Sequence, residues 1–181
     1  RELIGPVPLT DGPGIEHVNL PAEGYVHTAA VRVDQLGLGD AIASQMSPKS
    51  YRQFALPYEQ RIFAAVHELG ALARLHICGN TSDRLDMFLK TGCTVIFFDQ
   101  KVDIAKAKEV LFGKMCFGGN VAPVHVLLNK TAAEVEQACK ETIEIAGKDG
   151  GYVLVPGCDI PPTIPYENLK VFHDTAINWK Y

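Results

Sequence analysis

Five short apolar runs, separated by segments with the pattern of helices, constrain the fold of this sequence more than any other feature. The runs are continuously apolar, whereas strands with one solvated face alternate between polar and apolar residues. Strands that alternate with helices form a parallel sheet. The sequence therefore predicts an α/β fold with a parallel sheet that is covered on both faces. The five runs are residues 36–40, 71–77, 94–99, 114–120 and 151–158.

Helix signals fall between these runs. Pro57 should kink or split the first long helix, because proline lacks the amide that an internal turn needs. Thr131 and Glu134 have the spacing of a capping box, which marks the start of a helix. The longest helices are expected over residues 47–70, 131–147 and 165–179.

The N-terminal residues differ from the rest of the chain. Residues 1–23 are rich in glycine and proline and lack periodicity, and residues 24–35 are compatible with a short helix. We therefore expect an irregular lead-in over residues 1–35 and one α/β domain over residues 36–181. The domain holds five or six βα units. No glycine-rich dinucleotide fingerprint follows a strand, and a complete eight-unit barrel usually needs roughly 250 residues.

Composition narrows the classes of partner. The net charge is −4 and no segment is strongly basic, which argues against nucleic acid. No apolar run approaches the roughly 20 residues of a membrane helix, and no signal peptide is visible, so no membrane association is expected. The five cysteines are irregularly spaced and odd in number, which favours free thiols in a reducing, cytoplasmic compartment.

Each apolar run ends in a polar or metal-ligand residue. In parallel α/β folds the carboxyl ends of the strands carry the active site, so these side chains are candidates for one site. Packing alone would accept serine, threonine or glycine at these positions. The strand-end candidates are Asp40, His76, Cys78, Asp99, Asn120 and Cys158.

Three of these residues have the chemistry of a zinc site. His76 and Cys78 are two residues apart on a strand and point to the same side, and Cys158 lies at the same edge of the sheet. One imidazole and two thiolates suit zinc, and three protein ligands leave the fourth position open for a substrate. A substrate thiol would lose its proton there. The alternative is packing, because single cysteines and histidines are often buried core residues.

The other strand-end residues have equally plain alternatives. Asp40 and Asp99 could cap the following loop or helix, and Asn120 could adopt a turn conformation after two glycines. Cys93 and Cys139, like Cys116, have no nearby partner in the sequence and are interpreted as buried thiols.

Several sequence blocks resemble the uroporphyrinogen decarboxylase superfamily. They cover residues 36–178, and together they are specific. The resemblance implies a (β/α)8 barrel of which this chain holds the C-terminal part. The blocks read GDAIASQMSPKSYRQFALPYEQRI, LHICGN, FFDQKVDIAKAKEV, FGGNVAPVHVLLNKTAAEVE and LVPGCDIPPTIPYENLK.

Two branches of the superfamily differ at the strand-end residues. The tetrapyrrole decarboxylases are metal-free and have a histidine near the last strand, where this sequence has Cys158. The corrinoid-dependent methyltransferases carry His-x-Cys and a distant cysteine as zinc ligands, which here match His76, Cys78 and Cys158. The resemblance thus implies zinc-dependent methyl transfer from a methylated corrinoid (a cobalamin) to a thiol such as coenzyme M.

The resemblance also implies partners and supporting residues. The corrinoid would be presented by a carrier protein, and the partial barrel would need an oligomer or the remainder of the barrel. Asp99 and Asn120, and in the same way Asp40, would orient the substrate or hold a ligand in place. Two alternatives stay open: a metal-free decarboxylase, which would need arginines in its pocket, and a non-catalytic partial-barrel module.

Overall fold

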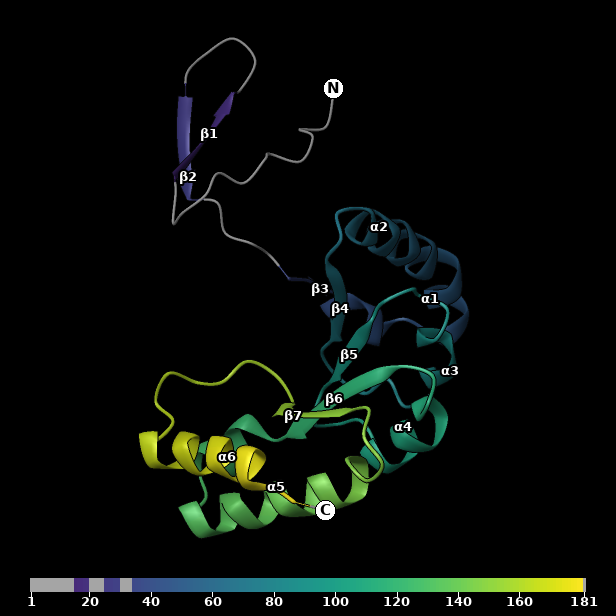
Figure 1. The fold of residues 1–181 in the computed structure, drawn as a ribbon. Helices are drawn as coiled ribbons and strands as arrows, with labels where there is room; N and C mark the ends of the chain where they lie inside the picture. The colour runs from purple at the N-terminus through teal and green to yellow at the C-terminus, as the bar shows by residue number, and fades with distance from the viewer. Residues whose placement is uncertain (1–14, 20–24, 30–33, 181) are drawn as a thin grey trace.

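The computed structural model describes residues 15–19, 25–29 and 34–180 of the chain, and Figure 1 shows their arrangement. Five parallel strands form one sheet, in which each strand lies beside the next one in the sequence. A doubly wound sheet reverses its strand order, whereas a barrel keeps it sequential. The fold is thus the expected α/β partial barrel. Its strands are β3 (Gln35–Gly39), β4 (Leu72–Ile77), β5 (Val95–Phe98), β6 (Cys116–Val121) and β7 (Tyr152–Pro156).

The helices follow the pattern that the sequence predicts. The break at Pro57 is confirmed, since α1 ends at Phe54 and α2 begins at Leu56. The capping box of Thr131 and Glu134 is confirmed at the start of α5. Among the described residues, no helix combines the length and apolarity needed to cross a membrane. The helical elements are η1 (Ala41–Gln45), α1 (Pro48–Phe54), α2 (Leu56–Glu68), α3 (Leu85–Phe88), α4 (Ile104–Leu111), η2 (Pro123–Leu128), α5 (Ala132–Ala146) and α6 (Tyr166–Asn178).

Helices cover only one face of the sheet, so the prediction of two covered faces is wrong for the described residues. Ala73, Leu75 and Ile77 of β4 point into the helix layer and are at most 2% exposed. Leu72, on the opposite face, is 50% exposed. Right-handed crossovers between sequentially ordered strands place every helix on the same side. The second face carries the residues that point into the interior of a closed barrel.

The core against β4, β5 and β6 contains a row of aromatic rings. Tyr51 of α1 packs edge-on against Phe88 with ring centres 5.9 Å apart, and Phe88 contacts Phe98 at 6.0 Å. Phe98 in turn contacts Phe117 of β6 at 6.4 Å. These rings are almost completely buried, and they join α1 and α3 of the helix layer to β5 and β6 of the sheet. The row therefore fixes the strands whose opposite face carries the candidate site.

The described part of the lead-in is a pair of strands. β1 (Ile15–Asn19) pairs with β2 (Tyr25–Ala29) in antiparallel register. The expectations of a short helix at residues 25–29 and of irregular chain at residues 15–19 are therefore wrong. Tyrosine, valine, isoleucine and threonine favour strands, and pairing between two such segments outweighs the weak helical tendency of either. Most of residues 1–35 lie outside the described residues.

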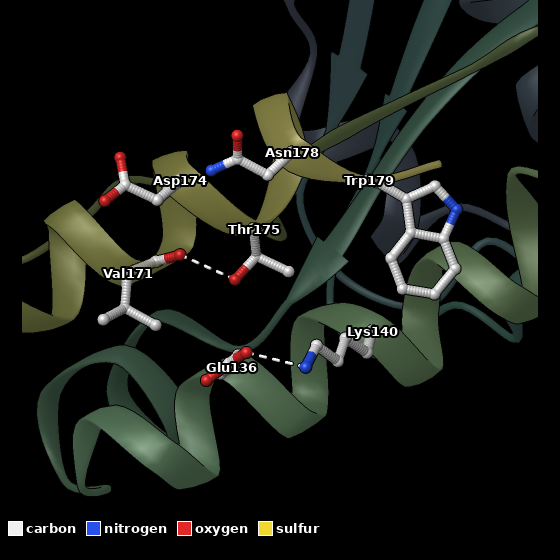
Figure 2. A pocket seen from close by; sticks show the side chains of 7 residues that line it. All are labelled: Glu136, Lys140, Val171, Asp174, Thr175, Asn178 and Trp179. Atoms are coloured by element: carbon white, nitrogen blue, oxygen red, sulfur yellow. Dashed lines mark hydrogen bonds and ion pairs between the residues drawn. The ribbon is translucent and has the colours of Figure 1, made fainter. Parts of the chain in front are cut away.

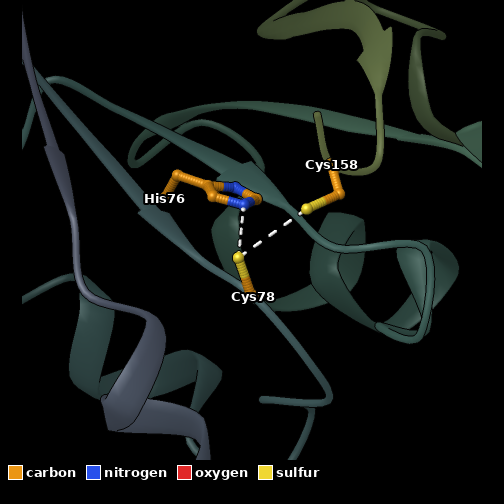
Figure 3. A group of neighbouring side chains, drawn as sticks. All are labelled: His76, Cys78 and Cys158. Atoms are coloured by element: carbon orange, nitrogen blue, oxygen red, sulfur yellow. Dashed lines mark hydrogen bonds between the residues drawn. The ribbon is translucent and has the colours of Figure 1, made fainter. Parts of the chain in front are cut away.

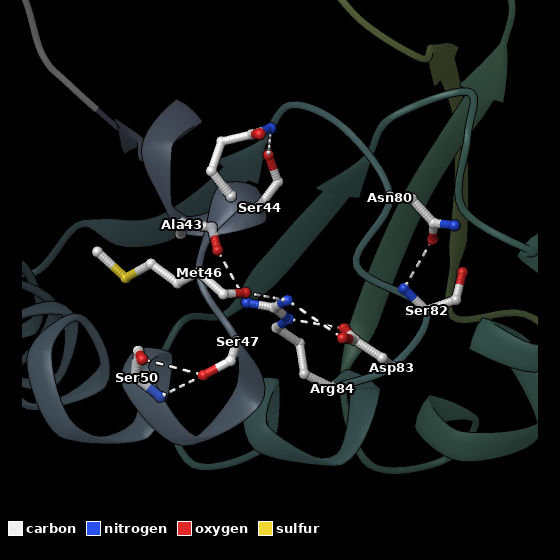
Figure 4. A network of polar contacts seen from close by, with 10 residues as sticks. Ala43, Ser44, Met46, Ser47, Ser50, Asn80, Ser82, Asp83 and Arg84 are labelled. Carbon is white, nitrogen blue, oxygen red and sulfur yellow. Dashed lines mark hydrogen bonds and ion pairs between the residues drawn. The ribbon is translucent and has the colours of Figure 1, made fainter.

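A buried arginine joins the loop before α3 to the loop before α1 (Figure 4). Arg84 is only 2% exposed. Its Nη1 donates to the carbonyl oxygen of Ala43 at 2.8 Å, and its Nη2 donates to that of Met46 at 2.7 Å. Its Nε donates to Asp83, and its guanidinium lies over the ring of Tyr51. The side chain thus holds η1, directly after β3, against the loop that follows β4.

We expect Arg84→Ala to lower the free energy of unfolding by about 3 kcal/mol, because the buried carbonyl groups of Ala43 and Met46 lose their donors. Arg84→Lys keeps the charge but not the fork of donors, so its free energy of unfolding should lie between those of the original protein and of Arg84→Ala. Urea denaturation followed by circular dichroism measures the change. The exposed Arg61→Ala is the control, and equal stability of the Arg84 and Arg61 variants would contradict the role of this network.

Candidate metal centre

Three predicted ligands meet at the carboxyl ends of β4 and β7 (Figure 3). His76 Nε2 lies 3.3 Å from Cys78 Sγ, and Cys78 Sγ lies 3.7 Å from Cys158 Sγ. One ligand atom from each of the three residues lies within 4.8 Å of those of the other two. The three side chains are half-buried. The arrangement predicted from the sequence spacing is therefore present as a compact cluster.

The spacing of the cluster fits a tetrahedral ion. With Zn–S bonds of about 2.3 Å and Zn–N bonds of about 2.0 Å, neighbouring ligand atoms in a tetrahedron lie about 3.5–3.8 Å apart. The sulfur–sulfur distance of 3.7 Å and the nitrogen–sulfur distance of 3.3 Å are close to these edges. A disulfide would need about 2.05 Å. Both cysteines are free thiols.

The backbone of β5 orients the imidazole. His76 Nδ1 lies 2.9 Å from the carbonyl oxygen of Phe97, an acceptor, so Nδ1 carries the hydrogen and donates it. The lone pair then belongs to Nε2, the nitrogen that faces the two sulfur atoms. A hydrogen bond of this kind to the second ring nitrogen is usual for metal-binding histidines.

Cys158 reaches the cluster because the sheet curves and a glycine precedes it. In a flat sheet, three strand steps would separate β4 from β7 by about 14 Å. Gly157 packs directly on the loop after β5, since a Cβ there would lie 2.5 Å from the backbone nitrogen of Gln100. Its amide donates to the carbonyl oxygen of Val121 at 2.9 Å. This close approach of the two loops brings Cys158 to the site.

The local electrostatics favour a cation. Burial is the main cause that raises the pKa of Cys78, and the neighbouring Cys158 sulfur and the carboxylates of Asp99 and Asp159 raise it further. Two thiols beside two carboxylates make an environment in which negative charge accumulates when the thiols ionise. A divalent ion would relieve that repulsion and hold both sulfur atoms as thiolates.

Asp99 and Asn120 lie beside the cluster and organise a loop. Asp99 is 6% exposed, and its carboxylate accepts a hydrogen bond from the amide of Lys101 at 2.8 Å. This is the loop-capping role that the sequence allows as the alternative to substrate binding. Asn120 Nδ2 donates to the carbonyl oxygens of Asp99 and Val102 at 3.1 and 2.8 Å. Both side chains therefore fix the loop that Gly157 packs against.

Asp40 lies next to β4 but faces a buried acid. Its amide donates to the carbonyl oxygen of His76 at 2.9 Å, whereas its carboxylate interacts with Glu59 of α2. Glu59 is only 2% exposed and accepts a hydrogen bond from the hydroxyl of Tyr51. Burial is the main cause that raises the pKa of Glu59 to about 7, and Asp40 raises it further. Sequence reasoning missed Glu59, because an acid in the first turn of a helix is ordinarily exposed.

A hollow of about 510 Å³ opens on the uncovered face of the sheet, beside the cluster. His76, Cys78 and Cys158 line it, together with Arg74 of β4 and Phe97 of β5. Asp40, Asp99 and Asn120 do not line it. Sequence reasoning placed Arg74 inside a strand without assigning its face. The two-residue step between Arg74 and His76 was the available signal, because it puts both on one side of the strand.

A second hollow, of about 370 Å³, lies between α5 and α6 (Figure 2). Several of its polar side chains are already engaged. Lys140 pairs with Glu136 one turn before it at 2.6 Å, and the hydroxyl of Thr175 donates to the carbonyl oxygen of Val171 at 2.8 Å. No cysteine or histidine lines it, so it offers none of the ligand chemistry of the cluster.

The remaining cysteines lie outside the cluster. Cys93 and Cys139 are 6% and 0% exposed, and burial raises their pKa to about 11 and about 12. Burial also raises the pKa of Cys116 in β6. Thiols that stay protonated in apolar surroundings are poor nucleophiles and poor ligands.

The fold and the cluster together define a partial (β/α)8 barrel with a candidate metal centre at the carboxyl ends of its strands. Residues 25–179 match the family described as Uroporphyrinogen decarboxylase (URO-D). The chain therefore belongs to the uroporphyrinogen decarboxylase family.

Individual relatives include both branches of the family. A methylcobamide:CoM methyltransferase (MtbA) of Methanosarcina acetivorans is 36% identical over 150 residues, which cover 82% of this chain and 43% of that protein. A uroporphyrinogen decarboxylase of Gloeobacter violaceus is 32% identical over 140 residues, covering 77% and 40%. Among solved structures, a methyltransferase from Methanosarcina mazei superposes with a TM-score of 0.71 and 31% identity, covering 80% of this chain and 42% of that one. The chain spans about two fifths of the length of these relatives.

We expect the stability of the protein to fall as the pH rises from about 5 to about 7, because of Glu59. The pKa of this carboxyl is about 7 in the folded chain and 4.5 in its ordinary state, so folding takes up a proton in this range and loses that advantage as the pH increases. The full effect is at most about 3 kcal/mol. Glu59→Gln mimics the protonated acid and should flatten this dependence.

Urea denaturation at a series of pH values measures this effect. The exposed Glu68→Gln, on the same helix, is the matched control and should keep the slope of the original protein. If Glu59→Gln leaves the slope between pH 5 and pH 7 unchanged, the buried carboxyl is not its source.

Proposed function

We propose that the chain carries the zinc site of a methyltransferase that moves a methyl group from a methylated corrinoid to a thiol. The observation that carries this proposal is the cluster of one imidazole and two thiols with near-tetrahedral spacing and a side open to the hollow. The relatives named methylcobamide:CoM methyltransferase support the reaction type. A metal-free decarboxylase has no need for two cysteines and a histidine in such an arrangement.

His76, Cys78 and Cys158 would hold the ion, and the hollow would receive the acceptor at the fourth position. A bound zinc ion supplies Lewis acidity, which lowers the pKa of a substrate thiol so that it ionises near neutral pH. The hydrogen bond from His76 Nδ1 to Phe97 keeps the imidazole in the ligating tautomer throughout.

The transfer itself needs no redox partner. The sulfur of the acceptor attacks the methyl carbon, a carbon–sulfur bond forms, and the carbon–cobalt bond breaks with its electron pair left on cobalt. The proton of the thiol leaves to solvent. The products are a methyl thioether and the reduced corrinoid, so atoms and electrons balance. Because the three residues line the hollow, an acceptor sulfur at the cluster would face the open side from which a corrinoid would approach.

The other strand-end residues would act by positioning. Asp99 and Asn120 hold the loop that packs against Gly157, and so support the position of Cys158. Asp40 would hold the end of β3 beside His76 through its backbone. Within the proposal, a corrinoid carrier protein presents the methyl donor, and a second copy or the remainder of a barrel covers the open face of the sheet.

The direct test is the metal content of the purified protein after zinc is supplied and excess is removed. We expect close to one equivalent of zinc, and we expect Cys78→Ser and Cys158→Ser to lose it, because each removes a thiolate ligand. Cys116→Ser, which changes a half-buried thiol outside the cluster, should keep it. Absence of zinc from the original protein, or its retention in both ligand variants, would refute the site.

Turnover is measured separately, as loss of methylcobalamin absorbance in the presence of a small thiol. The Cys78 and Cys158 variants should be slowed by more than about 10-fold, since even changes next to metal ligands cost that much. Zinc binding without any methyl transfer would leave a metal site but contradict the proposed reaction.

A further inference from the structure

The two cysteines of the cluster lie close enough to react with each other (Figure 3). Cys78 Sγ and Cys158 Sγ are 3.7 Å apart, and both thiols are free and half-buried. They come from segments 80 residues apart in the chain, at the ends of β4 and β7. In the part of the chain that the structure describes, no other two cysteine sulfur atoms are neighbours of this kind. The pair is therefore where this chain can form a sulfur–sulfur bond within one molecule.

Only a small movement separates the two thiols from a disulfide. The bond in a disulfide is about 2.05 Å long, so the sulfur atoms, now 3.7 Å apart, must approach each other by about 1.6 Å. Rotation about the two Cα–Cβ bonds can supply this shift, because sulfur is the last heavy atom of each side chain. The neighbouring residues Gly79 and Gly157 have no side chains that would obstruct the rotation.

The remaining cysteines are poorly placed for this chemistry. Cys93 and Cys139 are 6% and 0% exposed, so an oxidant in solution has little access to their sulfur atoms. Cys116 of β6 is half-buried, but no second thiol lies beside it among the described residues. A second thiol matters because it captures the first oxidised sulfur before oxidation goes further. Both access and a partner are therefore found together at Cys78 and Cys158.

We propose that Cys78 and Cys158 are also a redox pair, which a peroxide converts to a disulfide that excludes zinc and which a dithiol restores. Formation of the bond rests on the geometry of the two thiols alone, whereas its effect on zinc rests on the proposed function.

The oxidation balances with hydrogen peroxide as the oxidant. One thiol gives two electrons to the peroxide, whose oxygen–oxygen bond breaks, and becomes a sulfenic acid with release of water. The second sulfur then attacks the sulfenic sulfur, the sulfur–oxygen bond breaks, and a second water leaves with the remaining thiol proton. Two thiols and one peroxide thus give one disulfide and two waters. A dithiol reverses the change by thiol–disulfide exchange and becomes a disulfide itself.

The disulfide and the zinc ion need the same sulfur atoms in different states. Zinc binds cysteine as the thiolate, which carries a negative charge. After oxidation the two sulfur atoms share a bond and are uncharged, so of the three ligands only the imidazole of His76 remains. A single neutral ligand does not hold zinc tightly, and each molecule therefore carries either the disulfide or the ion.

The test treats the metal-free protein with equimolar hydrogen peroxide, followed by alkylation, tryptic digestion and mass spectrometry. Trypsin leaves each cysteine on its own peptide, with Cys78 on residues 75–84 and Cys158 on residues 149–170. We expect these two peptides to be joined, with the loss of two hydrogen atoms. The number of alkylated cysteines should fall from five to three, since five minus the two that are joined leaves three. Dithiothreitol should restore all of them.

Zinc binding is measured on the same samples with a colorimetric chelator. The oxidised protein should bind zinc at least about 10-fold more weakly than the reduced protein, because even changes next to metal ligands cost that much. Protein loaded with zinc should release it in step with the appearance of the joined peptides.

Serine variants identify the two partners. Cys78→Ser should give no joined peptides, and its Cys158 should proceed to the sulfinic acid, because no second thiol captures it. The matched control is Cys116→Ser, which removes a half-buried thiol outside the pair and should form the disulfide to the same extent as the original protein. Circular dichroism of each variant verifies that it is folded.

The outcomes separate the two proposals. Alkylation of all the cysteines after treatment, oxidation of Cys78 and Cys158 without linkage, or a disulfide between other cysteines overturns the redox pair. Undiminished zinc binding by the oxidised protein overturns the exclusion of zinc. If the reduced protein binds no zinc, the proposed function fails and the exclusion of zinc fails with it, whereas the joined peptides, which are measured without metal, still decide the redox pair.

Discussion

The two-residue period of β4 is the constraint on which the rest of the structure depends. Ala73, Leu75 and Ile77 point to the helices and form the core, so Arg74 and His76 must point to the other side. A shift of one residue would bury a guanidinium and an imidazole among aromatic rings and expose the core side chains. Packing of one face of β4 in the core therefore determines which residues lie on the other face, where the candidate site is.

Much of the site could be predicted from the sequence because the relevant information is local. His76 and Cys78 share a face by spacing alone, and parallel strands place their carboxyl ends at one edge. Pro57 and the capping box of Thr131 likewise act within one helical turn. The identity of Cys158 as a third partner needed only the order of the strands and the resemblance to a family.

The rest depended on contacts between distant segments. Asp40 ends a strand like the other candidates, yet its carboxylate meets Glu59, a residue whose burial comes from packing of α2 and not from its local pattern. When the strands are interpreted as continuously apolar, their two faces are not distinguished, although the step between Arg74 and His76 marks the uncovered face of β4. The unassigned face of Arg74 and the uncovered side of the sheet have this same origin.

The cluster also ties the curvature of the sheet to the chemistry. β5 and β6 lie between the strands that supply the ligands, and a flat sheet would keep those strands about 14 Å apart at their ends. The sulfur atoms are 3.7 Å apart only because the sheet curves and Gly157 lets two loops meet. An ion bound by the residues at the ends of β4 and β7 would stabilise that curvature, because the free energy of metal binding adds to the free energy of folding. Asp99 and Asn120 form no hydrogen bond to either sulfur, but they support the cluster indirectly. Their hydrogen bonds fix the loop against which Gly157 packs.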